Sequence, residues 1–150
     1  MTAVRGRLAV LLTLVAATGL SACNTLLGDD PTPKTVRFEV LGGAGADVEI
    51  VVSREFVAAT NETGVTQVEV FLADTVLAAL PYDQELDVSL QRRFFVQVTP
   101  TDTLDIPDAR VIVSINGEER FNDSGVLPVD PPFRYVYVYN QRVTRVIEVF

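Results

Sequence analysis

One cysteine, Cys23, is the only thiol in the 150-residue chain, and it closes the sequence LSAC at 20–23. Residues 8–20 form an uncharged apolar run of thirteen residues, and Arg5 and Arg7 precede that run. A positive start followed by a short apolar stretch is typical of a secretory signal. Thirteen residues are too few for a helix that crosses about 30 Å of hydrocarbon.

The LSAC sequence resembles the lipobox of bacterial lipoproteins at all four positions. This resemblance implies that Cys23 carries a diacylglycerol, that cleavage falls between Ala22 and Cys23, and that the new amino terminus is acylated. Two or three acyl chains, such as palmitate, give a lasting membrane anchor, because one chain alone binds only marginally. Asn24 is not the aspartate that favours retention in the inner membrane, so the resemblance implies the outer membrane where a cell has two. Two other interpretations stay open: an uncleaved anchor helix, and a plain signal peptide with a free cysteine.

Three aspartates recur at every third position of the segment PTDTLDIPDAR at 100–110, namely Asp102, Asp105 and Asp108. Oxygen-rich loops of this kind can hold calcium. The spacing differs from that of a calcium loop with ligands on alternate residues, and Pro107 stiffens the middle. We expect a solvated loop between strands and keep a weak calcium site as the alternative.

A tyrosine and valine alternation near the C-terminus places Tyr135, Tyr137 and Tyr139 on one face of a strand. If the valines face the core, the tyrosines form an exposed stripe between Arg134 and Arg142. Such a stripe suits contact with protein or carbohydrate, because each tyrosine offers a flat apolar body and a polar tip. In the alternative hypothesis the tyrosines pack against side chains of the neighbouring strand, namely Arg142, Thr144 and Val146.

Composition excludes several kinds of chemistry. The chain has no histidine, which removes Ser-His-Asp and Cys-His catalysis and the commonest transition-metal ligand. A pair of carboxylates could still act as acid and base in glycoside cleavage, but no spacing places two acids in one cleft. With 12 basic and 20 acidic residues the net charge is −8, and loss of Arg5 and Arg7 with the signal would make it −10. Without a basic cluster we expect no nucleic-acid partner.

The rest of the chain shows the two-residue periodicity of half-buried strands. Alternation predicts strands at 35–41, 47–52, 66–72, 85–90, 94–99, 109–115, 135–139 and 143–150. Residues 74–81 fit an edge strand that ends at Pro81, with a helical turn as the alternative. The glycine-rich segment 42–46 predicts a turn. Asn116-Gly117 predicts a two-residue type I′ hairpin, and Asn140-Gln141 predicts a weaker hairpin between the last two strands.

These features predict an all-β chain: an immunoglobulin-like antiparallel β-sandwich of about seven or eight strands at 35–150. A lipoprotein signal at 1–22, which includes the signal helix, and a short lipidated tether at 23–34 precede it. We prefer a sandwich to a barrel because no pattern of inward polar residues suggests a ligand cavity.

A second resemblance covers residues 36–126. The order FEVLGGAGADVEIVV, LPYDQELDV, FFVQVT and ARVIVSINGEERFNDSG is similar to the periplasmic β-sandwich of small mycobacterial membrane proteins called MmpS. Those proteins are accessory partners of lipid and drug exporters. This chain lacks the paired cysteines and the uncleaved transmembrane helix of that family, and it adds a C-terminal hairpin. The resemblance implies a fold, and it carries over no functional residue.

Three functions are compatible with the sequence. We expect a non-enzymatic binding or accessory module that is held on the cell membrane by lipid and meets an envelope protein or an extracellular ligand. Apart from the lipid on Cys23 and the possible calcium ion, no cofactor is expected. The alternatives are a structural envelope lipoprotein without a defined ligand and a hydrolase that uses carboxylates.

Overall fold

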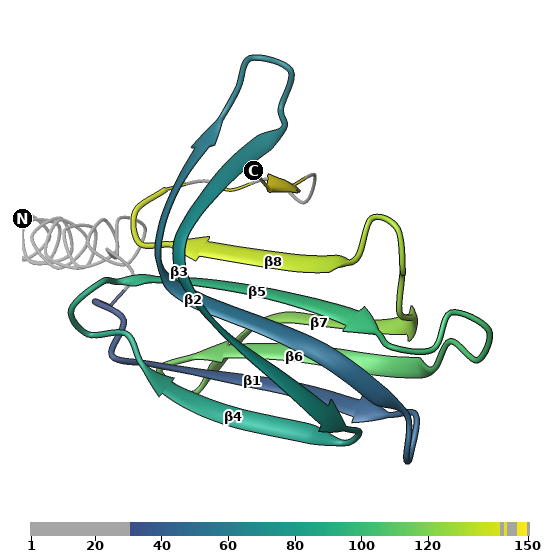
Figure 1. The fold of residues 1–150 in the computed structure, drawn as a ribbon. Helices are drawn as coiled ribbons and strands as arrows, with labels where there is room; N and C mark the ends of the chain where they lie inside the picture. The colour runs from purple at the N-terminus through teal and green to yellow at the C-terminus, as the bar shows by residue number, and fades with distance from the viewer. Residues whose placement is uncertain (1–30, 142, 144–146, 150) are drawn as a thin grey trace, which may run out of the picture. The chain divides into compact units, whose positions relative to one another are not determined.

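Nine β-strands make up the regular structure of the described residues, which are 31–141, 143 and 147–149 in the computed structural model (Figure 1). In chain order they are β1 (Thr35–Gly42), β2 (Asp47–Thr60), β3 (Thr66–Ala79), β4 (Tyr82–Asp87), β5 (Arg93–Pro100), β6 (Asp108–Ile115), β7 (Glu118–Val126), β8 (Phe133–Val138) and β9 (Ile147–Val149). From Thr32 onward they belong to one unit. No helix in these ranges is long and apolar enough to cross a membrane. The predicted signal helix, Cys23 and most of the predicted tether lie outside the described residues.

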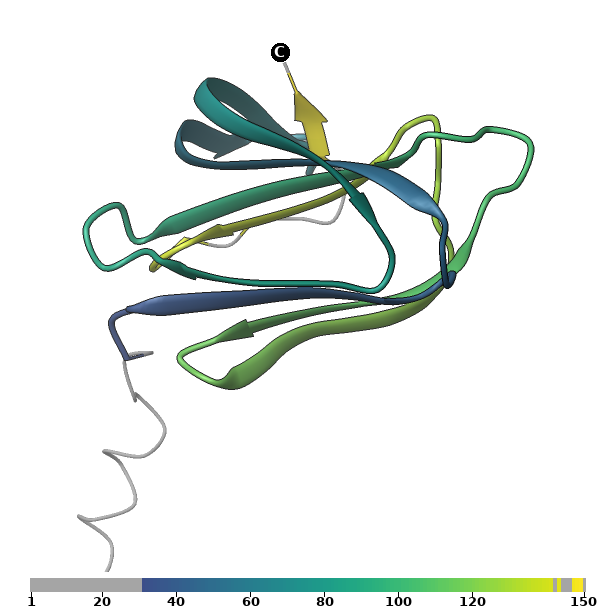
Figure 2. The same ribbon diagram turned by 60° about the horizontal axis from the view of Figure 1, so that its bottom comes forward.

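The strands form two packed sheets, which confirms the predicted β-sandwich (Figure 2). Sheet A has four strands in the order β4-β1-β6-β7, and sheet B has five in the order β8-β5-β2-β3-β9. Every pairing is antiparallel except that of β3 with β9, which is parallel. One side of the sandwich therefore ends at β7 and β8. The opposite side ends at β4 of sheet A and at β9 of sheet B, and because β9 pairs only with Thr66–Val68, the rest of β3 is also an edge there.

Alternating apolar residues from both sheets meet in a main core between the sheets. Strands β1, β2, β5 and β6 present every second side chain to this core, as the periodicity predicts. The two sheets contribute side chains that are less than a tenth exposed, among them Val36, Phe38, Val40, Val48, Ile50, Phe94, Val96, Val98, Val111, Val113 and Ile115. At about 1.5 to 3 kcal/mol for each large apolar side chain, this burial is the main favourable term in folding.

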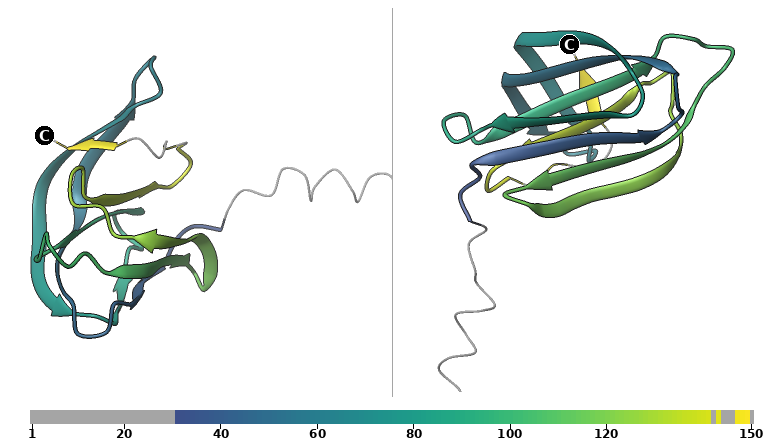
Figure 3. Two further views of the ribbon diagram at one scale, coloured as in Figure 1. Left: turned by 90° about the vertical axis from the view of Figure 1, so that its right-hand side faces the viewer. Right: turned by 90° about the horizontal axis from the view of Figure 1, so that it is seen from below.

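A second core lies on the other face of sheet B. It contains Phe56, Val68, Phe95 and Val136, with Val51, Ala58, Val70, Val138, Val143, Ile147 and Val149 packed around them. It exists because β2 and β3 bend: their register shifts between Val52 and Phe56 (Figure 3). The buried Ser53 hydroxyl donates to the Leu72 carbonyl oxygen and accepts from the Glu55 amide at 3.0 Å, which satisfies polar groups at the bulge.

Two turns agree with their predictions. Asn116 and Gly117 have φ values of 52° and 80°, as a type I′ turn requires, and they join β6 to β7 with Ile115 paired to Glu118. Residues 42–46 form the predicted glycine turn between β1 and β2. There Gly43 has a φ of 55°, and a Cβ added to it would lie 2.7 Å from Pro107 Cβ. Glycine is needed at this position for both its conformation and its size.

The segment between β3 and β5 confirms one prediction and corrects another. Residues 74–79 are strand, as preferred, although they continue β3 instead of forming a strand of their own. The strand predicted at 85–90 is misplaced, because β4 spans Tyr82–Asp87. The Asp87 carboxylate accepts a hydrogen bond from the Ser89 amide at 2.8 Å, and this turn ends the strand.

The C-terminal hairpin prediction is wrong. Asn140 lies in a turn with a φ of 59°, but β9 pairs in parallel with Thr66–Val68 of β3 instead of pairing with β8. Side-chain burial gives the physical reason, because Ile147 and Val149 cover the second core. The Arg134 guanidinium also donates to the Ile147 carbonyl oxygen at 3.0 Å, so β8 and β9 come close although they are opposite edges of sheet B.

The chain enters the sandwich beside the turn that joins β6 and β7. The Asn116 side chain accepts from the Lys34 amide at 2.7 Å and donates to the Thr32 carbonyl oxygen at 3.2 Å. The Val88 amide donates to the Lys34 carbonyl oxygen at 2.8 Å. The last residues of the predicted tether are therefore fixed to the domain.

Candidate functional site

A groove of about 860 Å³ lies along the side of the sandwich where β7 and β8 are the edge strands. We call it the β7–β8 groove. Its volume falls within the range of about 300 to 1,000 Å³ typical of small-molecule sites. Its walls come from β7, the loop after it, β8 and the segment that follows: Arg120, Phe121, Asp123, Pro128, Pro131, Pro132, Phe133, Arg134, Tyr135, Val136, Tyr137, Val138, Gln141, Val143 and Ile147.

Aromatic rings join the two sheets in this groove. The Phe121 ring of sheet A lies 5.6 Å from the Phe133 ring and 5.4 Å from the Tyr135 ring of sheet B, measured between ring centroids. The ring planes are tilted by 55° and 57°, an arrangement that favours aromatic attraction. The edge strands β7 and β8 are thus connected by side-chain packing, and the groove has an aromatic wall.

Two of the three predicted tyrosines line this groove. Tyr135 and Tyr137 are paired in register with Val96 and Phe94 of β5, so they point toward the main core and pack against it. Val136, on the other face of β8, is buried in the second core. Because both faces of β8 are covered, the tyrosines are half-buried wall residues instead of a fully exposed stripe. Their packing partners lie mainly on β5 and β7, and Thr144 and Val146 of the alternative hypothesis lie outside the described residues.

Tyr139 lies apart from the other two tyrosines. It follows the end of β8 and is not among the groove residues. Its backbone amide donates to the Arg92 carbonyl oxygen at 3.0 Å, which continues the pairing of β8 with β5 by one residue. The structure therefore brings Tyr135 and Tyr137 together and leaves Tyr139 at the end of the sandwich.

The Tyr135 hydroxyl resists ionisation. Burial raises its pKa to about 12, the neighbouring Tyr137 adds to the rise, and the Arg120 guanidinium opposes it. At neutral pH the hydroxyl is therefore a neutral hydrogen-bonding group inside an apolar wall. Such a group can orient a bound molecule and does not serve as a base.

The two arginines of the groove are held by protein acceptors. The Arg134 side chain donates to the Gln97 side chain at 2.9 Å and to the Ile147 carbonyl oxygen at 3.0 Å. Arg120 forms an ion pair with Glu118 at 3.2 Å. Both guanidinium groups are positioned by these contacts, and the groove combines an apolar wall with fixed cations at its border. Arg142, the other predicted flanking arginine, lies outside the described residues.

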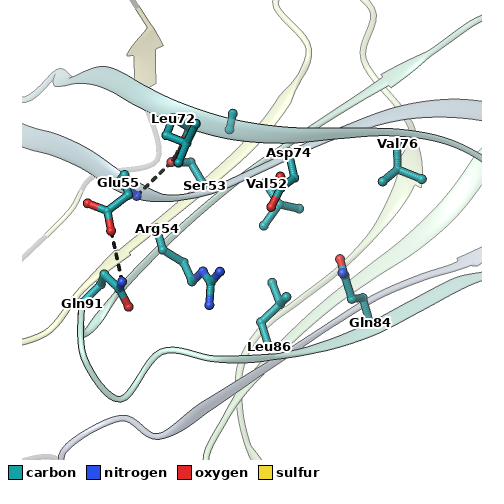
Figure 4. Close-up of a pocket in the computed structure, with 11 residues that line it drawn as sticks. Val52, Ser53, Arg54, Glu55, Leu72, Asp74, Val76, Gln84, Leu86 and Gln91 are labelled. Atoms are coloured by element: carbon teal, nitrogen blue, oxygen red, sulfur yellow. Dashed lines mark hydrogen bonds between the residues drawn. The ribbon is translucent and has the colours of Figure 1, made fainter.

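A smaller pocket opens on the opposite side of the sandwich, where β3 and β4 are the neighbouring edges (Figure 4). We call it the β3–β4 pocket. It has a volume of about 130 Å³ and contains two carboxylates, those of Glu55 and Asp74. The Gln91 side chain donates to the Glu55 carboxylate at 3.0 Å. Because sites for drug-sized molecules measure about 300 Å³ or more, this pocket is too small for a sugar ring and its neighbours.

The acidic loop predicted as a weak calcium site lies between β5 and β6. The Asp102 carboxylate accepts from the Leu104 amide at 2.8 Å and from the Asp105 amide at 3.4 Å, so it stabilises the turn of its own loop. Among the residues that the structure describes, no group of three or more acidic, cysteine or histidine side chains is placed to hold a metal ion. Calcium binding by Asp102, Asp105 and Asp108 stays a prediction, and the described residues do not form a ligand cluster that supports it.

Sequence reasoning missed Phe121 and Phe133. Phe133 continues the alternation of Tyr135 and Tyr137, so the pattern contains a signal for it. Phe121 has no comparable signal, because its role depends on the meeting of two strands from different sheets.

A scan of protein-family models and searches of curated proteins and solved structures find no match to this chain.

Proposed function

We propose that this chain is a lipid-anchored, non-enzymatic binding module of the cell envelope that holds an apolar ligand in the β7–β8 groove. The groove carries the proposal. It has the size of a ligand site, an aromatic wall from two sheets, and two tyrosines and two positioned arginines among its lining residues. Apolar walls with a few fixed polar groups are what a binding site needs, since the walls supply affinity and the polar groups set orientation.

The ligand we propose has an apolar body with rings or an extended chain and a polar edge. Phe121, Phe133 and the two tyrosines would contact the body, and the Tyr135 hydroxyl would face the polar edge. Such a body can be a free molecule or the side chains of an envelope protein. We regard the envelope protein as the partner of this site in the cell.

The proposed anchor is the lipidated Cys23. Residues 24–31 separate it from Thr32, where contacts with Asn116 begin. Eight residues span at most about 29 Å, so the sandwich would stay close to its membrane. In a cell with two membranes we propose the outer membrane as the site of attachment.

Cys23→Ser tests the anchor. The variant should leave the membrane fraction for the soluble fraction, because the acyl chains provide the lasting attachment. Membrane flotation of wild type and variant measures this directly. If the variant floats as wild type does, lipidation at Cys23 is not the anchor.

Crosslinking in intact cells followed by pull-down tests the groove. Tyr137→Ser removes a wall side chain, and we expect it to reduce recovery of the crosslinked partner at least about tenfold, a change of about 1.4 kcal/mol. Gln84→Ser is the matched control, because Gln84 is half-buried in the β3–β4 pocket. An identical set of recovered proteins from wild type and Tyr137→Ser would favour the structural lipoprotein without a defined ligand.

The hydrolase is the remaining alternative. The pair of carboxylates in the β3–β4 pocket is the observation in its favour, and the volume of about 130 Å³ is the observation against it. We therefore retain the binding module as the proposed function.

A further inference from the structure

The end of the sandwich at which the chain enters also carries the loop between β4 and β5, residues 88–92 (Figure 2). The Val88 amide donates to the Lys34 carbonyl oxygen at 2.8 Å, so this loop lies against the last residues of the predicted tether. The Arg92 amide donates to the Val88 carbonyl oxygen at 2.7 Å and closes the loop into a tight turn. Leu90 lies within that turn and is 87% exposed. A large apolar side chain is therefore held beside the point where the tether joins the domain.

Basic and aromatic residues accompany Leu90 at this end. Arg92 and Lys34 are exposed. Tyr139, the tyrosine outside the groove, is held here by its amide bond to the Arg92 carbonyl oxygen. We call Lys34, Leu90, Arg92 and Tyr139 the tether-end surface. An exposed leucine together with tyrosine, arginine and lysine is typical of protein surfaces at the boundary between a bilayer and water.

Two carboxylates at this end are engaged within the domain. Asp87 accepts from the Ser89 amide at 2.8 Å, and Glu118 forms an ion pair with Arg120 at 3.2 Å. Glu119, in the hairpin of β6 and β7, is exposed. These contacts lower the repulsion between this end and lipid phosphates.

The acidic loop after β5 lies at the opposite end of the sandwich (Figure 2). β5 starts at Arg93, next to the tether-end surface, and its eight residues end at Pro100, before Asp102, Asp105 and Asp108. A strand of this length spans about 25 Å. Exposed charges are largely screened beyond about 8 Å at physiological ionic strength. The net charge of the chain therefore does not decide how the tether-end surface meets a membrane.

We propose that the tether-end surface docks on the phospholipid bilayer that holds the anchor, an inference that rests on the proposed lipidation of Cys23. Residues 24–31 keep Thr32 within about 29 Å of that bilayer. A surface attached by so short a segment is present at high effective concentration, so a weak contact is sufficient. Leu90 enters the boundary of the acyl chains, and the Arg92 guanidinium binds a lipid phosphate.

This docking sets the direction of the β7–β8 groove. In the pairing of β8 with β5, Val138 lies opposite Arg93 at the tether end, and Phe133 lies opposite Val98 farther along the sandwich. The groove therefore extends away from the bilayer, and its Phe133 end faces the space in which a partner approaches.

Quenching by brominated lipids tests the docking. In the mature lipidated chain the Cys23 sulfur is alkylated, so Leu90→Cys supplies the one free thiol for a fluorophore. The matched control is Leu104→Cys, because Leu104 is 96% exposed in the loop at the opposite end. Both chains are reconstituted in phosphatidylcholine vesicles with bromine on the acyl chains, which quenches fluorophores that reach the hydrocarbon. We expect quenching at position 90 to be at least about fivefold stronger than at position 104. Adding Arg92→Gln should reduce quenching at position 90 about twofold, because the phosphate contact is lost.

Vesicle flotation separates failure of the docking from failure of the anchor. If the labelled chains float but are quenched equally at the two positions, or more strongly at position 104, the docking is overturned and the anchor stands. If the chains do not float with the vesicles, the anchor is overturned and the docking with it. Quenching that Arg92→Gln leaves unchanged would overturn the phosphate contact. All three substituted residues are exposed, so the variants should fold as wild type does, and circular dichroism checks this.

Discussion

The two sides of the sandwich are closed by different kinds of contact. On the β7–β8 side, Phe121 of sheet A packs against Phe133 and Tyr135 of sheet B and leaves a groove of about 860 Å³. On the β3–β4 side, polar side chains at the bulge of β2 leave a pocket of about 130 Å³. Comparison of the two sides shows that large aromatic rings can join two sheets and still leave an open, apolar groove between the edge strands.

The difference originates in how each side uses its edge strand. β8 is covered on both faces, by the main core and by the second core, so its side chains are ordered wall residues. The Asp74–Ala79 part of β3 has mostly exposed side chains, and its polar neighbours fill the small pocket. A rigid apolar wall favours ligand binding, whereas an exposed strand edge favours pairing with another strand.

Phe121→Ala should have the largest effect. The substitution removes two ring contacts and leaves a cavity, and we expect the free energy of unfolding to fall by about 2 to 3 kcal/mol. Leu86→Ala, a half-buried residue beside the β3–β4 pocket, should cost about 1 to 2 kcal/mol. Denaturant unfolding measures both changes. If both variants lose the same free energy of unfolding, the aromatic contacts stabilise the β7–β8 side no more than Leu86 stabilises the β3–β4 side.

The pH dependence of stability should also separate the two sides. The pKa of Tyr135 rises from 10.0 to about 12 on folding, so its protonated form is favoured in the native state. Its contribution to stability is complete below pH 10 and is lost as the pH rises to about 12.

Tyr135→Phe should therefore lose less stability than wild type does over this alkaline window. Tyr82 of β4 supplies the control on the other side. Burial raises the pKa of Tyr82 too, but its hydroxyl donates to the Gln84 side chain in a less enclosed place. Over the same alkaline window, Tyr82→Phe should change the pH dependence of the free energy of unfolding less than Tyr135→Phe does. A larger change from Tyr82→Phe would contradict the described burial of Tyr135.

An apolar fluorescent dye should bind in the β7–β8 groove in preference to the β3–β4 pocket. We expect Tyr137→Ser to weaken dye binding about fivefold, because it removes part of an aromatic wall. Gln84→Ser should leave the affinity unchanged. If both variants bind the dye as wild type does, the dye site lies elsewhere, and the exposed β3 edge is then tested with Leu77→Lys.

The smallest effect should come from the carboxylates of the small pocket. Glu55→Gln and Asp74→Asn should each change the free energy of unfolding by about 0.5 kcal/mol or less, because partly exposed polar contacts contribute little. Neither variant should alter partner recovery in the pull-down. If Asp74→Asn reduces partner recovery, the partner binds at the β3–β4 pocket and not in the β7–β8 groove.

The sequence was sufficient for the parts of the fold that local pattern determines. Alternation placed Val36, Phe38 and Val40 in the core, and Asn116-Gly117 located the hairpin of β6 and β7. It could not place residues 143–150, because the position of Ile147 depends on the bend of β2 and β3, a contact between distant segments. The same limit applies to the site. Tyr135 and Tyr137 are visible as a pattern, whereas the packing of Tyr135 against Phe121 joins two different sheets.

Site-specific photocrosslinking in cells tests the central proposal most directly. A photoreactive residue replaces Tyr137 in the groove or, as the control, Gln84 in the β3–β4 pocket of the otherwise native chain. We predict a discrete crosslinked adduct from position 137 at least about tenfold more abundant than any from position 84. Equal adducts from both positions, or an adduct from position 84 alone, would contradict a ligand site in the β7–β8 groove.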